Sequence, residues 1–94
     1  MEKVISKIVK HIMEKKFPKF IDVDVKKEKD FFDTYVNDEL NYEYHIFLTV
    51  DYSDFIPISN SGEWDKLKSF IREIIRISGI KNPIRIYINF PDED

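Results

Sequence analysis

Residues 42–52 alternate between apolar and polar side chains with Phe47 as the one exception, and this segment constrains the fold more than any other. One phase holds Tyr42, Tyr44, Ile46, Leu48, Val50 and Tyr52, and the other holds Glu43, His45, Phe47, Thr49 and Asp51. Successive side chains of a strand point to opposite faces of a sheet, so the pattern predicts a half-buried strand. The apolar face of such a strand requires a covering layer.

Two stretches have the period of an amphipathic helix and can supply that layer. Residues 1–16 place one apolar face opposite a row of lysines, and Pro18 follows as a stop signal. Residues 63–78 carry a second apolar stripe, formed by Trp64, Leu67, Phe70, Ile71, Ile74 and Ile77. Asn60 or Ser61 is the expected N-cap, and Gly79 fits the left-handed position that ends a helix.

Three shorter segments read as further strands. Residues 20–27 and 84–90 alternate with a period of two, and residues 31–36 are rich in aromatic and β-branched side chains. The short polar link after residue 36 predicts an antiparallel hairpin with residues 42–52. Pro57 lies in residues 55–58, which we expect to form an extended connector rather than a central strand.

These elements predict an α+β fold with the order α-β-β-β-α-β. The simplest arrangement is a two-layer sandwich, with both helices on one face of a mostly antiparallel four-stranded sheet. A chain of 94 residues fits one domain. We expect that domain to span residues 1–91, followed by a solvated acidic tail at residues 92–94.

Composition excludes several classes of protein. The chain has no cysteine, which excludes disulfides and thiolate chemistry, and no run approaches the ~18 apolar residues of a membrane span. No signal peptide pattern is present, so we expect a soluble cytoplasmic protein without membrane contact. The chain lacks Ala and Gln and is rich in residues with A/T-rich codons. This bias suggests a low-GC genome of a bacterium, an archaeon or a virus, and a bacteriophage virion is one setting.

The charges are sorted along the chain although the net charge is only −3. Residues 1–29 and 66–90 are basic, whereas residues 30–65 hold nine acidic residues and neither Lys nor Arg. The predicted fold gives the helices a basic outer patch, formed by Lys3, Lys7, Lys10, Lys68, Arg72 and Arg76. Three interpretations are open: the charges balance within the molecule, copies associate head to tail, or the basic patch binds nucleic acid.

The sheet face away from the helices is the other candidate surface. We expect it to carry Glu43, His45, Phe47, Thr49, Arg85, Tyr87 and Asn89, with Asp22 and Asp24 beside them. Mixed aromatic and polar side chains are typical of protein interfaces, and the same aromatic rings could stack on single-stranded bases. The neighbouring carboxylates oppose the second use because they repel phosphates.

Signals for catalysis or metal binding are few. His45 has carboxylates on the same strand face, but a step of two residues separates them by ~7 Å, too far for one metal ion without ligands from other elements. Asp51 and Asp54 have the spacing of a loop cation site, a common pairing. The only glycines are Gly62 and Gly79, so there is no Gly-rich phosphate loop.

One short motif on residues 22–26, Asp-x-Asp-x-Lys, is similar to the acid-x-Lys motif of metal-dependent nucleases with the restriction-endonuclease-like fold. The predicted element order is also similar to that fold's core. However, those enzymes carry the motif on the third core strand, whereas here it lies on the first predicted strand. Residues 42–52 contain no lysine. The chain is therefore not assigned to that family.

The sequence thus predicts a protein without enzymatic activity, metal or cofactor. We expect a protein–protein interaction or structural module within a larger assembly, and its partner is either a second copy or a foreign protein. The alternative is a nucleic-acid-binding accessory domain that uses the basic outer patch of the helices. A small metal-dependent nuclease is the third possibility.

Overall fold

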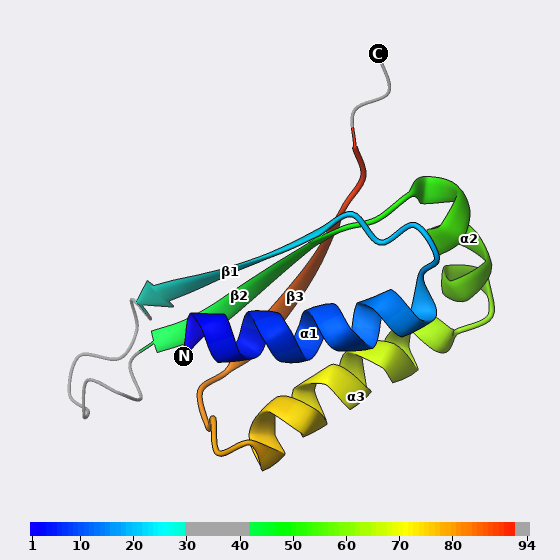
Figure 1. Ribbon diagram of the computed structural model, residues 1–94. Helices are drawn as coiled ribbons and strands as arrows, with labels where there is room; N and C mark the ends of the chain where they lie inside the picture. The colour runs from blue at the N-terminus through cyan, green and yellow to red at the C-terminus, as the bar shows by residue number, and fades with distance from the viewer. Residues whose placement is uncertain (30–41, 92–94) are drawn as a thin grey trace.

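The computed structural model describes residues 1–29 and 42–91, and these residues form an α+β fold (Figure 1). The elements are α1 (Glu2–Lys16), β1 (Asp22–Lys29), β2 (Tyr42–Thr49), α2 (Tyr52–Asn60), α3 (Glu63–Ile77) and β3 (Ile84–Asn89). The predicted fold class is confirmed for this part of the chain. The predicted strand at residues 31–36 and the acidic tail at residues 92–94 lie outside the described residues.

The sheet is mixed and, in the described part of the chain, has three strands in the order β1-β2-β3. β2 is the central strand, antiparallel to β1 and parallel to β3. After β2 the chain returns along the sheet through α3, so β3 starts at the same end as β2 and runs in the same direction (Figure 1). The prediction of a mostly antiparallel sheet was wrong for the pairing of β3 with β2, whereas the predicted fourth strand lies outside the described residues.

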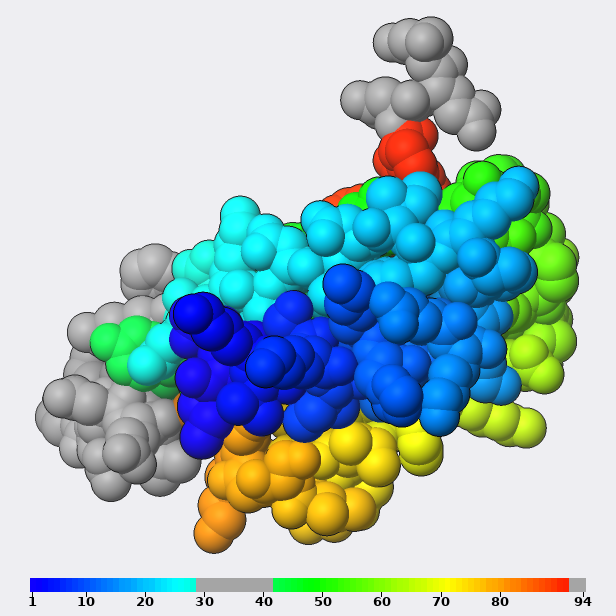
Figure 2. Space-filling view, in the orientation of Figure 1, coloured from blue at the N-terminus to red at the C-terminus, as the bar shows by residue number. Residues whose placement is uncertain are grey.

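A single apolar core lies between the sheet and the two long helices. Ile46 and Leu48 of β2 are completely buried, as are residues from one face of α1 and one face of α3: Ile5, Val9, Met13, Ile71 and Ile75. Both helices therefore cover the same face of the sheet, as predicted. The predicted apolar stripe of α3 was wrong at Phe70 and Ile77, which are 52% and 68% exposed, and it missed the buried Ile75. In Figure 2 they form the near surface of the molecule, with β1 visible along one edge.

Residues 55–58 correct the prediction of an extended connector, because they belong to α2, with Pro57 inside the helix. The helix begins at Asp51, whose carboxylate accepts hydrogen bonds from the Ser53 N–H at 2.9 Å and the Ser53 hydroxyl at 2.6 Å. Asp51 thus caps α2. The spacing of Asp51 from Asp54 had suggested a cation site, which is a different role.

The ends of α3 agree in part with the sequence analysis. The N-cap is Gly62, with φ 79°, and not Asn60 or Ser61, although the Ser61 hydroxyl accepts from the Glu63 N–H at 3.4 Å. At the other end the Gly79 N–H donates to Arg76 and the Ile80 N–H donates to Ile75, the pattern of a Schellman motif. Gly79 has φ 100°, which confirms its predicted position.

Replacement of a core side chain of β2 should show how much the fold depends on this strand. Ile46→Ala leaves a cavity between the sheet and both helices, so we expect it to lower the free energy of unfolding by about 2–5 kcal/mol in urea denaturation. The matched control is Ile77→Ala on α3, where the side chain is 68% exposed and the change should stay within about 0.5 kcal/mol. Equal losses in the two variants would contradict this description of the core.

Candidate functional site

The sheet face opposite the two long helices, here called the open face, carries the candidate site. The strand register places its side chains in rows that cross all three strands. Asp24, Phe47 and Tyr87 form one row, and Lys26, His45 and Arg85 form the next. Thr49 lies between Asp22 and Asn89 in a third row. The structure therefore brings the seven predicted interface residues together on one face.

An aromatic cluster occupies the middle of the open face. The rings of Phe47 and Tyr87 stack, with centroids 5.0 Å apart and planes 15° from parallel. The imidazole of His45 lies 5.6 Å from the Tyr87 ring centroid, and the Lys26 ammonium lies 5.4 Å from that of Phe47. Contacts of this kind fix the ring positions, because stacked pairs and cation–π contacts favour specific geometries. The cluster is a preformed apolar platform, and Tyr87 remains 37% exposed.

The charges beside the cluster compensate one another. One Glu43 oxygen accepts from Arg85 Nε at 3.0 Å and lies 3.0 Å from His45 Nε2. An ionised carboxylate only accepts hydrogen bonds, so His45 carries a proton on Nε2 in this contact. The hydrogen bond from His45, together with the positive charge of Arg85, lowers the pKa of Glu43 below its usual value. At this end of the open face, the negative charge of Glu43 is therefore compensated by Arg85.

Lys26 is the residue that the interface prediction missed. It shares a strand phase with Asp22 and Asp24, so the alternation along β1 was sufficient to place it on the open face. The sequence could not show that it contacts Phe47, because this contact depends on the pairing register of β1 with β2.

The residues predicted as a basic outer patch do not form one uniform group. Lys3, Lys7 and Lys10 are exposed on α1 and make no ion pair with any described residue. On α3, by contrast, Lys68 lies 3.2 Å from Asp65, and Arg76 lies 2.6 Å from Glu73. Arg72, the remaining predicted patch residue on α3, points toward β3.

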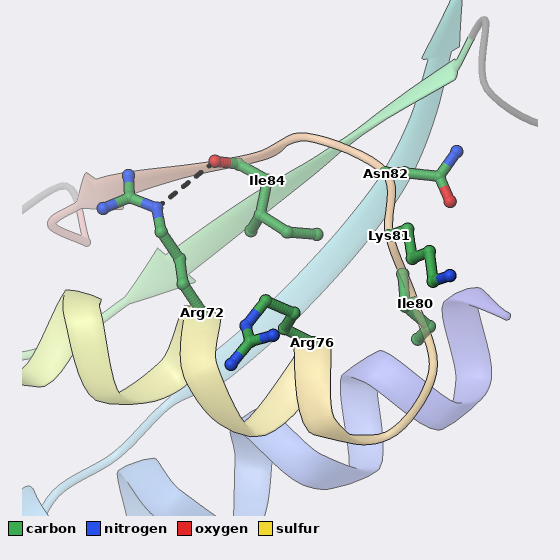
Figure 3. Close-up of a pocket in the computed structure, with 6 residues that line it drawn as sticks. All are labelled: Arg72, Arg76, Ile80, Lys81, Asn82 and Ile84. Carbon is green, nitrogen blue, oxygen red and sulfur yellow. Dashed lines mark hydrogen bonds between the residues drawn. The ribbon is translucent and has the colours of Figure 1, made fainter.

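An open pocket of about 430 Å³ lies between the C-terminal half of α3 and the start of β3 (Figure 3). Its lining residues are Arg72, Arg76, Ile80, Lys81, Asn82 and Ile84. Arg72 reaches from α3 to the backbone of β3, where its Nε donates to the Ile84 carbonyl at 3.4 Å. Asn82 donates to the Tyr42 carbonyl at 3.0 Å and so ties the loop before β3 to the start of β2. No local pattern in the sequence indicates this pocket, because its lining residues come from α3, the following loop and β3.

Of the candidate catalytic and metal-binding residues, His45 and Glu43 are in contact at 3.0 Å, closer than the ~7 Å step along the strand suggested, but no third ligand joins them in the described residues. Asp22, Asp24 and Lys26 all lie on the open face of β1, and His11 is exposed on α1, in the layer that covers the opposite face. Within residues 1–29 and 42–91, no three His, Asp or Glu side chains are close enough together to hold a metal ion.

The chain was compared with known proteins in three ways. No family model matches it, no curated protein matches it, and no solved structure matches it. In the described residues, no helix has the length and apolar character needed to cross a membrane.

The pH dependence of the free energy of unfolding should reveal the contribution of the Glu43 ion pairs. Since folding lowers the Glu43 pKa, its carboxylate stabilises the fold above the unfolded-state value of 4.5, and this contribution disappears as the pH falls through the lower folded-state value. We therefore expect wild type to be more stable than Glu43→Gln at pH 7. The difference should shrink below about pH 4.5 in urea denaturation. A difference that stays constant from pH 7 to pH 3 would contradict the assignment.

Proposed function

We propose that this protein is a non-enzymatic protein-contact module whose open face is covered by another polypeptide in a larger assembly. The observation that supports the proposal best is the stacked pair of Phe47 and Tyr87 at the middle of that face. Aromatic side chains are enriched in protein interfaces and dominate their binding energy when they lie near the centre.

The arrangement of charge supports the same use. Charged groups flank the aromatic cluster, and Glu43, the most enclosed carboxylate among them, already has two hydrogen-bond partners. A partner that buries this face would not leave that carboxylate unpaired, which would otherwise be costly. Arg85 and Asp24 remain at the margin, where they can select a complementary partner.

A second copy of the chain is the occupant that we test first. The basic and acidic segments could contribute to such contacts, but an interface centred on stacked rings should depend little on salt. The codon-related composition suggests a low-GC genome, and a phage virion or a similar assembly is one setting that fits it. In this proposal, the protein is located in the cell interior or in the virion itself.

Light scattering after size-exclusion chromatography, at low and high salt, tests self-association. We expect a concentration-dependent oligomer whose mass does not change with salt. Phe47→Ser or Tyr87→Ser should weaken association roughly 10- to 30-fold, the range expected for a central interface aromatic. Phe70→Ser is the matched control because Phe70 is 52% exposed on α3, outside the open face. A monomer at ~1 mM and both salts would exclude self-association and leave only a foreign partner.

Nucleic-acid binding is the second candidate, and the exposed lysine row of α1 favours it. Lys3, Lys7 and Lys10 make no ion pair with described residues, so their charges are available to phosphates. A fluorescent single-stranded oligonucleotide, titrated at 50 and 200 mM salt, tests this candidate. If the row binds phosphates, exchange of all three lysines for Gln should abolish binding and its salt dependence. Unchanged binding in that variant would rule out the row as the binding surface.

A further inference from the structure

β3 has one edge that pairs with no described strand. The carbonyls of Pro83 and Asn89, at its two ends, accept from Tyr44 and Val50 on the β2 side, at 2.9 and 3.1 Å. In a parallel ladder, alternate residues point to opposite edges, so Ile84, Ile86 and Ile88 direct their backbone groups away from β2. No described residue bonds to the backbone of Ile86 or Ile88 on that side. Among the described residues, the outer edge of β3 is therefore used only by Arg72, which donates to the Ile84 carbonyl, and the backbone groups of Ile86 and Ile88 have no partner there.

The two outer strands differ in how they protect their edges. β1 is charged at six of its eight positions, including three lysines, and charged side chains discourage the addition of another strand. β3 has the sequence Ile-Arg-Ile-Tyr-Ile-Asn, with one charge and a strong preference for extended structure. Of the two outer strands in the described part of the chain, β1 therefore disfavours strand addition and β3 favours it.

The pocket beside the unpaired edge has a distinct chemical character. Its floor is apolar, with Ile80 4% exposed and Ile84 half-buried. Its rim carries Arg72, Arg76 and Lys81, and none of the six lining residues is acidic. Glu73 compensates Arg76, whereas Arg72 and Lys81 have no carboxylate partner among the described residues. A ligand that fits this pocket combines an apolar group with a negative charge.

We propose that the unpaired edge of β3 binds an extended acidic peptide of a partner protein, which adds to the sheet as a further strand. The peptide backbone pairs with Ile86 and Ile88, as in other cases of strand addition. One apolar side chain rests on Ile80 and Ile84, and one carboxylate binds Arg72 and Lys81. Both side chains must point toward the helical layer, so they occur two residues apart in the peptide.

A second copy of this chain is a poorer occupant. A β3 strand from a second copy would present Ile84, Ile86 and Ile88 to the helical layer, and none of these side chains carries a carboxylate for Arg72 and Lys81. A foreign strand with one acidic side chain supplies that carboxylate.

A nucleic acid is also a poorer occupant, because the cations are confined to one end of the region beside β3. The first turn of α3, at the other end of the helix, carries the carboxylates of Glu63 and Asp65. A chain with a phosphate at every step would meet these carboxylates. A peptide with a single acidic side chain would contact only the pocket.

The probe for this site is the capped peptide acetyl-TVTDTV-amide, which places Val and Asp on one strand face two residues apart. Its control, acetyl-TVTNTV-amide, replaces the carboxylate with an uncharged group of the same shape. We expect the acidic peptide to slow hydrogen exchange at the Ile86 and Ile88 amides, followed by nuclear magnetic resonance. The control peptide should bind at least about tenfold more weakly.

Protein variants separate this site from the open face. Arg72→Gln combined with Lys81→Gln should weaken binding of the acidic peptide at least about tenfold, whereas the matched pair Lys3→Gln and Lys7→Gln on α1 should have no effect. Phe47→Ser should also leave peptide binding unchanged, so failure here and failure of the open face can be distinguished.

Several results would overturn the proposal. These are no binding at 5 mM peptide, equal binding of the acidic and control peptides, or protection of amides elsewhere without protection of Ile86 and Ile88. Tighter binding of an oligothymidine of eight nucleotides, weakened by the same Arg72 and Lys81 changes, would assign the pocket to nucleic acid instead.

Discussion

Burial of one face of β2 is the interaction on which the rest of this structure depends. Ile46 and Leu48 are fully buried and lie between two neighbouring strands and beneath two helices. Because the two long helices cover the same side, the sheet has a covered face and an open face. Because β2 is the central strand, β1 and β3 form the two edges of the sheet in the described part of the chain. Both candidate surfaces, the open face and the unpaired edge, follow from this one-sided core.

Local periodicity predicted the elements well but not every buried position, because Phe70 and Ile77 lie at the edges of the α3 stripe and are exposed. The two long helices, β2 and β3 were recognisable, and the phase of their alternation assigned the open-face residues correctly. Strand direction was not predictable in the same way, because Ile84 to Asn89 alternate identically in a parallel and an antiparallel strand. The direction of β3 comes from the return of the chain through α3, which is a property of the tertiary fold.

Other features were missed because their signals are weak or depend on distant contacts. α2 has nine residues, buries none of them fully and contains Pro57, so its periodicity was no guide. Asp51 and Ser53 did offer a capping signal. The joint contact of Glu43 with His45 and Arg85 requires the register of β2 with β3. The pocket requires Arg72 to meet a strand twelve residues further along the chain. Neither arrangement follows from spacing alone.

The parallel pairing of β3 has a consequence for the order in which the fold assembles. Tyr44 and Ile84 are partners across forty residues, whereas β1 and β2 are joined by a much shorter segment. Closing the longer loop costs more entropy, so we expect β3 to dock late and to detach first when the native state opens locally. A strand added to β3 would then hold the least secure part of the sheet in place. Binding of a strand at that edge would therefore lengthen the time for which the whole sheet stays intact.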